Sequence, residues 1–160
     1  MTADVPEIFN VLDVKLEGNN LIEAAAGTGK TYSIAVMVLR WILETENKID
    51  SVLAVTFTNY ATAELKERIL AFLEAALSCF EADGCEDATI KKVCDGCADK
   101  NKAAAKLRAA INDFDTASIF TIHGFCQKVI REHAFELGID FDMKLAEDTD
   151  TEKDAVTTFF

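Results

Sequence analysis

Two glycines, a lysine and two threonines lie close together near the N-terminus, in the order Gly27, Thr28, Gly29, Lys30 and Thr31. Glycine lets the backbone turn tightly and point its N–H groups at an anion, because no Cβ atom stands in the way. The Lys30 amine is long enough to reach the β- and γ-phosphates of a nucleotide, and the Thr31 hydroxyl is a suitable Mg²⁺ ligand. This spacing predicts a site for a nucleoside triphosphate.

The surrounding residues strengthen this prediction. The apolar run 21–24 predicts a strand that enters the loop, and the residues from Thr31 onward predict a helix whose N-terminus faces the phosphates. The alternative is a glycine-rich turn that binds nothing. Eight residues match the phosphate-binding pattern of P-loop NTPases, in which Ala24 replaces the leading glycine: Ala24, Ala25, Ala26, Gly27, Thr28, Gly29, Lys30 and Thr31.

Polar and aromatic residues lie at the end of the predicted strand 51–57 and directly after it; the strand is β-branched and apolar and is expected to be buried on both faces. Ligands of open α/β sheets bind beyond the carboxyl ends of the strands. Thr56, Thr58 and Asn59 can hydrogen-bond phosphates or sugars there, and an exposed Phe57 or Tyr60 can stack on a base. The alternative is that Phe57 belongs to the core and Asn59 caps the next helix.

A third group lies at the end of the predicted strand 118–122. Its members are Thr121, Ile122, His123, Gly124 and Phe125. His123 can contact a nucleic-acid backbone, although a histidine in such a place is more often structural. The sequence around this group does not offer the nucleophile and base of a hydrolytic enzyme.

The cysteines allow two interpretations. Four of the five lie in one stretch: Cys79, Cys85, Cys94 and Cys97. Four thiolates can hold Zn²⁺, but only the last pair has the spacing of metal ligands. Free thiols are the expected alternative, structural disulfides are not expected, and Cys126 is expected to be a small buried residue.

Composition predicts one globular, helix-rich domain, because half of the 160 residues are hydrophobic and only one is proline. The N-terminus does not resemble a signal peptide, and the apolar stretch 34–43 is interrupted by Arg40 and too short to span a membrane. We therefore expect a cytoplasmic protein with no membrane partner. The net charge of −12 argues against a non-specific DNA coat, but not against contact with one strand at a few points.

Hydrophobic periodicity predicts an α/β fold with a parallel sheet. The predicted strands are 21–24, 51–57 and 118–122, and the predicted helices are 31–45, 61–80, 101–114 and about 125–137, with a loop or broken helix over 81–100. The first of these helices suits a position beneath the sheet. A mostly helical stretch of about sixty residues separates the last two strands, which is longer than a usual crossover and predicts an inserted subdomain. The residues 149–152 fit a capping box that opens one more helix.

Taken in order, three segments resemble the first motifs of UvrD-like superfamily 1 DNA helicases: AAAGTGKT, AVTFTNYATAELKERI and SIFTIHGFCQKVI. The phrases LIEAAAGTGKT and FTIHGFCQ are most similar to the RecB-type helicase–nucleases, the beta subunits of exodeoxyribonuclease V. The likeness covers nearly the whole chain and is weakest over 80–110.

This resemblance implies an incomplete recA-like P-loop NTPase sheet with an inserted helical subdomain. Residues 1–65 would be the first part of subdomain 1A, 66–114 the start of subdomain 1B, and 115–160 the return to 1A. The resemblance also implies that ATP and Mg²⁺ bind at Lys30 and Thr31, and that 56–59 and 121–125 contact single-stranded DNA. The activity would be 3′–5′ helicase and exonuclease action in double-strand-break repair and recombination, and the partners would be the gamma and alpha subunits.

The sequence departs from the family in one important respect. No apolar strand ending in Asp-Glu follows Ile130, so the carboxylates that bind Mg²⁺ and activate water are missing, and no catalytic set is complete. We therefore expect an N-terminal part of a longer protein that is not hydrolytically competent alone. The alternatives are a small P-loop NTPase or nucleotide kinase, and a non-catalytic module that binds nucleotide or DNA.

Overall fold

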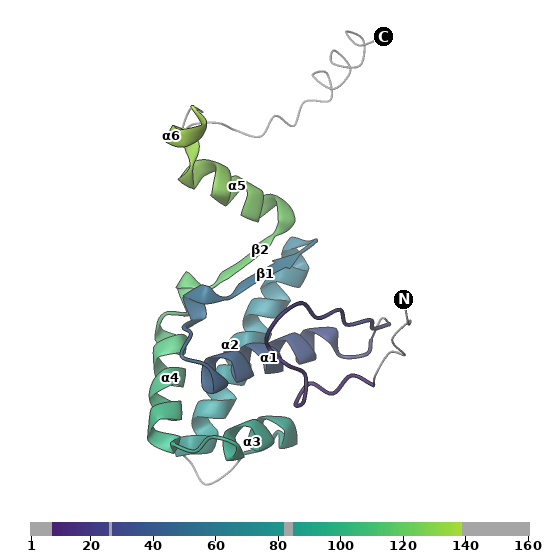
Figure 1. The fold of residues 1–160 in the computed structure, drawn as a ribbon, viewed down its shortest axis with the longest axis vertical. Helices are drawn as coiled ribbons and strands as arrows, with labels where there is room; N and C mark the ends of the chain where they lie inside the picture. The colour runs from purple at the N-terminus through teal and green to yellow at the C-terminus, as the bar shows by residue number, and fades with distance from the viewer. Residues whose placement is uncertain (1–7, 26, 82–84, 139–160) are drawn as a thin grey trace. The chain divides into compact units, whose positions relative to one another are not determined.

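The computed structural model describes residues 8–25, 27–81 and 85–138, whose regular structure consists of helices and one two-stranded sheet (Figure 1). The first compact unit ends at Ile122, and the second begins at His123. The first unit contains helices α1 (Lys30–Glu44), α2 (Asn59–Glu81), α3 (Ala88–Asp95) and α4 (Lys100–Asn112), strands β1 (Leu53–Thr56) and β2 (Ser118–Thr121), and the short 3-10 helices η1 (Ile49–Ser51) and η2 (Phe114–Thr116). Helices α5 (Ile122–Glu132) and α6 (Ala134–Leu137) follow.

The two strands are parallel, as the sequence predicts, and their register pairs Leu53 with Ser118 and Thr56 with Thr121. Helix α2 packs against both strands. Leu53 and Val55, which alternate with the residues facing α2, are 52% and 44% exposed. The prediction of a strand buried on both faces is therefore wrong, because the main helical contact of the strand is with α2 on one face.

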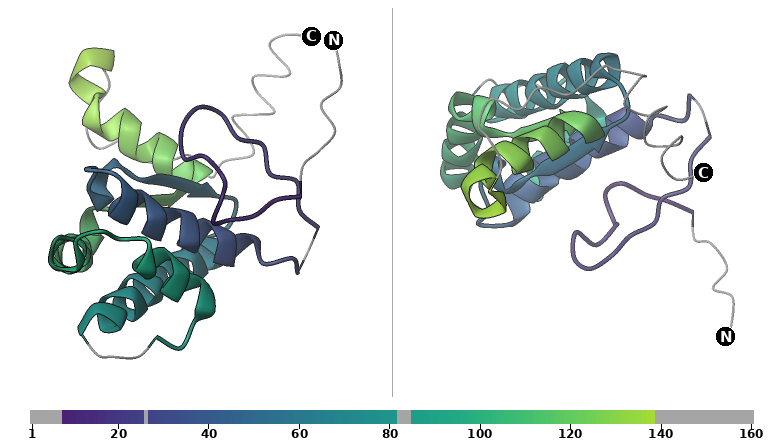
Figure 2. Two further views of the ribbon diagram at one scale, coloured as in Figure 1. Left: turned by 60° about the horizontal axis from the view of Figure 1, so that its bottom comes forward. Right: turned by 90° about the horizontal axis from the view of Figure 1, so that it is seen from above.

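The core lies between the helices of the first unit. Helix α1 packs mainly against α2 and α4, and also against α3. Figure 2 shows α1 among the other helices of this unit. The main contacts of α1 are therefore with helices, and not with the sheet as the sequence predicts. Leu77 and Phe80 near the end of α2 are half-buried, whereas Leu65, Ile69 and Leu73 form an apolar stripe on this helix that is buried. They meet Leu39 of α1 and Leu107 of α4 in one continuous cluster.

This shared core bears on the predicted domain organisation. Residues 1–122 form one compact unit, so the helical segment 66–114 packs together with the residues before it. The observed boundary between compact units falls after Ile122, within the motif 121–125. The assignment of 66–114 to a separate subdomain stays a prediction.

Most helices lie within a few residues of their predicted positions, but the predicted strand 21–24 differs. Residues 21–24 are not a strand, and Leu21 is 87% exposed, because none of the described residues pairs with this segment as a ladder partner. Helix α3 forms within the polar stretch 81–100, where the Asp87 carboxylate accepts the N–H groups of Thr89 and Ile90. The last predicted helix and its capping box at 149–152 lie outside the described residues.

Helix α5 begins at Ile122, immediately after β2 and earlier than predicted. In the part of the chain that the structure describes, we find no helix with the length and apolar character needed to cross a membrane.

Candidate functional site

The phosphate-binding pattern forms a turn that leads directly into α1. Gly27 and Gly29 have φ angles of 77° and 85°, a left-handed conformation that favours glycine. A Cβ atom at Gly27 would meet nothing within 4 Å, so this glycine is required by its backbone conformation and not by space. Gly29 is the N-cap of α1, and no side chain among the described residues caps this end. The first N–H groups of α1 are therefore open to an anion.

Lys30 lies at the start of α1 and folds back over the turn. Its Nζ atom donates hydrogen bonds to the carbonyl oxygens of Ala24 and Ala25, at 3.0 and 2.6 Å. The Thr28 hydroxyl donates to the same Ala25 carbonyl at 2.8 Å. These contacts keep an exposed ammonium group at the turn, where it can exchange neutral carbonyl acceptors for the charged oxygens of a phosphate.

The remaining residues of the pattern take their places around this turn. Thr31 is half-buried in the first turn of α1, next to Lys30. Ala24, Ala25, Gly27 and Thr28 are exposed. Ala26, also predicted to bind the nucleotide, lies outside the described residues.

Tyr32 joins the start of α1 to the start of α3, a link that sequence analysis did not foresee. Its hydroxyl donates to the Asp87 carboxylate at 3.1–3.2 Å, and its ring meets Phe72 edge-on with centroids 5.1 Å apart. Burial raises the pKa of Tyr32, and the negative charge of Asp87 adds to this effect. The helix that carries Lys30 and Thr31 is thus fixed to the residue that caps α3.

We expect Tyr32→Phe to lower the free energy of unfolding by about 1 kcal/mol, because the substitution removes one hydrogen bond and keeps the ring against Phe72. Urea unfolding of both proteins measures the difference. A raised pKa means that the folded state favours the neutral phenol, so the difference should persist below the ordinary tyrosine pKa of 10.0 and diminish as the pH rises above it. Equal stability of the two proteins at neutral pH would contradict the role of this contact.

The carboxyl ends of β1 and β2 lie side by side, because Thr56 is paired with Thr121. The sheet therefore brings Thr56 and Thr121, the last residues of the two strands, to one edge. The Thr56 and Thr62 hydroxyls are 2.6 Å apart, which ties the end of β1 to the first turn of α2. Thr58 accepts the N–H of Ala61 at 3.1 Å, so Thr58 and not Asn59 supplies the side-chain contact at the start of α2.

Two aromatic side chains stand out at this edge. Phe57 is 87% exposed and Tyr60 is 80% exposed. The alternative that Phe57 belongs to the core is therefore wrong. Both rings are free to stack on a planar ligand such as a nucleic-acid base.

The second predicted contact segment crosses the boundary between the two compact units. Thr121 ends β2, and Ile122, which is 42% exposed, begins α5. His123 is exposed in the first turn of α5, where Gly124 and Phe125 are half-buried. The structure therefore brings Thr56 and Thr121 together, and it places His123 to Phe125 in the helix that follows.

Cys94 and Cys97 are free thiols, as one interpretation predicts, but Cys79 and Cys85 differ from both interpretations. Cys79 and Cys85 form a disulfide, so neither free thiols nor thiolate ligands are present at these positions. Cys94 is buried and Cys97 is half-buried. Within the described ranges, no group of three or more His, Cys, Asp or Glu side chains can hold a metal ion, so the zinc prediction is wrong. Cys126 is exposed, not buried, because it lies on α5, a helix without a buried residue.

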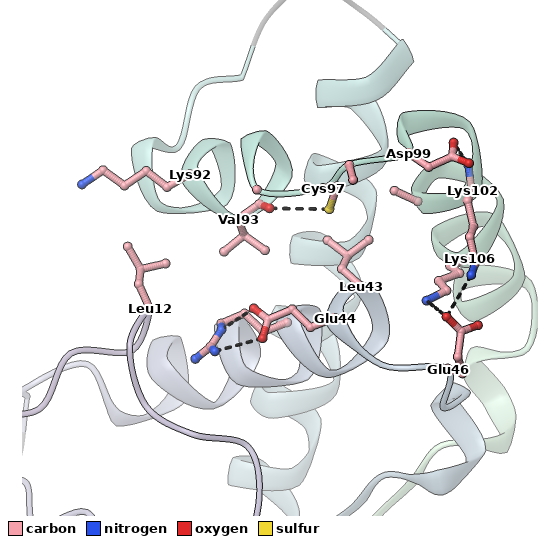
Figure 3. Close-up of a pocket in the computed structure, with 14 residues that line it drawn as sticks. Leu12, Leu43, Glu44, Glu46, Lys92, Val93, Cys97, Asp99, Lys102 and Lys106 are labelled. Carbon is pink, nitrogen blue, oxygen red and sulfur yellow. Dashed lines mark hydrogen bonds and ion pairs between the residues drawn. The ribbon is translucent and has the colours of Figure 1, made fainter.

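A cavity of about 520 Å³ lies between α1, α3 and α4 (Figure 3). Lys102 and Lys106 line it and bind the carboxylate of Glu46 at 2.9 and 3.3 Å. These two hydrogen bonds, with that of Lys102 the stronger influence, lower the pKa of Glu46. Arg40, which also lines the cavity, is paired with Glu44, and no residue of the phosphate-binding pattern lines this cavity.

Comparison with known proteins shows which family the chain belongs to. Residues 6–159 match the UvrD/REP helicase N-terminal domain. The chain is 38% identical over 155 residues to the RecBCD enzyme subunit RecB of Escherichia coli (strain K12), across 91% of this chain and 13% of that protein. It is 35% identical to RecB of Haemophilus influenzae, across 92% of this chain and 13% of that protein. It is 36% identical to an ATP-dependent helicase/nuclease of Listeria innocua, across 84% of this chain and 9% of that protein.

Proposed function

Because the chain belongs to the UvrD/REP helicase family, we propose that it is the ATP-binding and DNA-contacting part of an ATP-dependent DNA helicase. The observation that carries this proposal is the turn at the start of α1, where left-handed glycines, open N–H groups and the Lys30 amine converge. The proposed fold is a P-loop NTPase sheet of the recA type, to which β1 and β2 belong.

In this proposal, the residues Ala24 to Thr31 hold the phosphates of ATP. The N–H groups at the start of α1 would donate to phosphate oxygens, and Lys30 would leave the Ala24 and Ala25 carbonyls to bind them. The Thr31 hydroxyl would be the protein ligand of Mg²⁺, which neutralises phosphate charge when it is bound. Efficient hydrolysis also needs a carboxylate that positions the attacking water, and the proposed site contains none, so we expect binding without efficient turnover.

The proposed DNA contact is the edge formed by the ends of β1 and β2. Thr56, Phe57, Thr58 and Asn59 would contact a single strand together with the segment 121–125. The exposed ring of Phe57 supports stacking on bases, which does not require a positively charged surface. This matters because the whole chain carries a net charge of −12, which repels the phosphate backbone.

The chain spans about 13% of the length of the RecB relatives that it matches. By this likeness we propose that it acts within a larger cytoplasmic helicase and exonuclease that moves 3′ to 5′ on DNA in double-strand-break repair and recombination. The RecB relatives are named as subunits of the RecBCD enzyme, and we propose partners equivalent to its gamma and alpha subunits. The nucleotide-kinase alternative is less well supported, because Arg40, Arg68 and Arg108 are each paired with a glutamate and not gathered over the turn.

The direct test is a titration of the chain with a fluorescent ATP analogue and Mg²⁺, combined with an ATPase assay with and without single-stranded DNA. Saturable binding without DNA-stimulated turnover is the expected result. Phosphate transfer to a small acceptor would favour a kinase instead. Absence of binding would contradict the proposed nucleotide site in this chain.

Phe57→Ala tests the DNA contact. We expect it to weaken binding to a short oligothymidylate by about 1–3 kcal/mol, because it removes one stacking ring and leaves the fold intact. Fluorescence anisotropy at low salt measures the affinity. Phe135→Ala is a matched control, because Phe135 of α6 is also 87% exposed. If Phe135→Ala lowered the affinity for the oligothymidylate as much as Phe57→Ala, a specific role for Phe57 would be contradicted.

A further inference from the structure

The disulfide between Cys79 and Cys85 connects the end of α2 to the segment that precedes α3, with Cα atoms 4.9 Å apart. It lines a small cavity of about 170 Å³. Cys94 and two lysines, Lys91 and Lys100, line the same cavity. A disulfide, a thiol and two cations therefore share one opening to solvent.

The two lysines are not neutralised as others in the chain are. Lys102 and Lys106 bind Glu46, whereas Lys91 and Lys100 are exposed and have no hydrogen-bond or ion-pair partner among the described residues. Asp95 is the one carboxylate among the residues that line the cavity. The lining of the cavity thus carries one more positive than negative charge, in a chain whose net charge is −12. Nearby lysines attract an anionic reagent at short range, although salt screens this attraction within about 8–10 Å.

The neighbouring thiols are poor internal reductants of the disulfide. Cys94 is 4% exposed, and burial raises its pKa to about 11. Burial also raises the pKa of Cys97. Thiol–disulfide exchange requires a thiolate, and both groups remain protonated near neutral pH. A reagent from solution is therefore the better partner for exchange.

We propose that the Cys79–Cys85 disulfide is a reversible redox site that exchanges with an anionic low-molecular-weight thiol of the glutathione class, attracted by Lys91 and Lys100. In the first step, the thiolate of the reagent attacks one sulfur, forms a mixed disulfide and releases the other cysteine as a thiolate. A second reagent thiolate then attacks the mixed disulfide and releases the second cysteine. Two reagent thiols are oxidised to one disulfide, and their two protons pass to Cys79 and Cys85.

The position of the disulfide indicates what the exchange would change. Cys85 lies two residues before Asp87, the residue that caps α3 and receives the hydrogen bond of Tyr32. Reduction removes the covalent link that holds this start of α3 to α2. We expect the amide hydrogens of α3 to exchange faster with solvent in the reduced protein.

The test compares the rates at which glutathione and uncharged 2-mercaptoethanol reduce the full chain after oxidation with glutathione disulfide. Alkylation and intact mass follow the reaction, and before reduction only Cys94, Cys97 and Cys126 should be labelled. The rate of reduction by glutathione, divided by the rate of reduction by 2-mercaptoethanol, should fall roughly fivefold in Lys91→Gln/Lys100→Gln. The fall is expected because the two lysines no longer attract the anionic thiol. Lys15→Gln/Lys48→Gln removes the same charge elsewhere and should leave the ratio unchanged.

Three outcomes would overturn the proposal. The first is labelling of all five cysteines in the oxidised chain, which would mean that the disulfide does not form. The second is an unchanged rate ratio in Lys91→Gln/Lys100→Gln, and the third is an equal fall in the control. The proposal would be supported if Lys91→Gln/Lys100→Gln slowed reduction by glutathione but not by 2-mercaptoethanol, and if the amide hydrogens of α3 exchanged faster after reduction.

Discussion

Replacing Lys30 with alanine is expected to weaken the binding of ATP by roughly 100-fold or more, which corresponds to about 3 kcal/mol. The Lys30 amine is exposed and bonds only to two carbonyls of its own turn, so its loss removes no core contact. The expected loss is large because the amine would bind charged phosphate oxygens, and charge-assisted hydrogen bonds are the strong ones. Titration with a fluorescent ATP analogue and Mg²⁺ measures both affinities.

Two further variants sharpen this prediction. Lys15→Ala removes an exposed lysine outside the turn and should bind ATP like the unmodified chain. Lys30→Arg keeps the charge but replaces a compact amine with a larger planar group, and we expect intermediate affinity. If Lys30→Ala bound ATP as tightly as the unmodified chain, the turn would be the glycine-rich connection that binds nothing. Unchanged unfolding of Lys30→Ala by urea would show that a loss of affinity is local.

The features that sequence predicted well are those specified by neighbouring residues. The stripe that contains Ile69 and Leu73 repeats at helical spacing, and these side chains are buried as expected. The turn around Gly27 and Gly29 was also predictable, because only glycine adopts its left-handed backbone readily. The parallel pairing of β1 and β2 followed from the alternation of strands and helices.

The features that sequence missed depend on residues far apart in the chain. Tyr32 and Asp87 are separated by 55 positions, and neither residue alone signals the contact. The pairing of Cys79 with Cys85 depends on how the connection between α2 and α3 folds, which spacing cannot decide. The apolar run 21–24 has the composition of a strand, but a strand also requires a hydrogen-bonding partner, and none of the described residues provides one.

Arg40 is the clearest example of a missed residue, because from sequence it only interrupts an apolar stretch. It is 7% exposed, the one buried charged side chain that we find among the described residues. Its guanidinium donates to both carboxylate oxygens of Glu44, at 2.6 and 3.0 Å. It also donates to the carbonyls of Val11 and Val14, at 2.8 and 2.9 Å. Arg40 therefore holds the segment that precedes the phosphate-binding turn against α1.

We expect Arg40→Leu to lower the free energy of unfolding by about 2–4 kcal/mol, because it leaves two carbonyls and a carboxylate without their donor while nearly conserving volume. Arg108→Leu is the matched control: Arg108 pairs with Glu81 in solvent, with 54% of its side chain exposed, and should cost at most about 1 kcal/mol. Urea unfolding measures both. Amide exchange should also become faster over residues 11–14 in Arg40→Leu alone, since that segment loses its attachment to α1. If Arg40→Leu cost no more than Arg108→Leu, the N-terminal segment would be held by its apolar contacts, and Arg40 would be dispensable for positioning the turn.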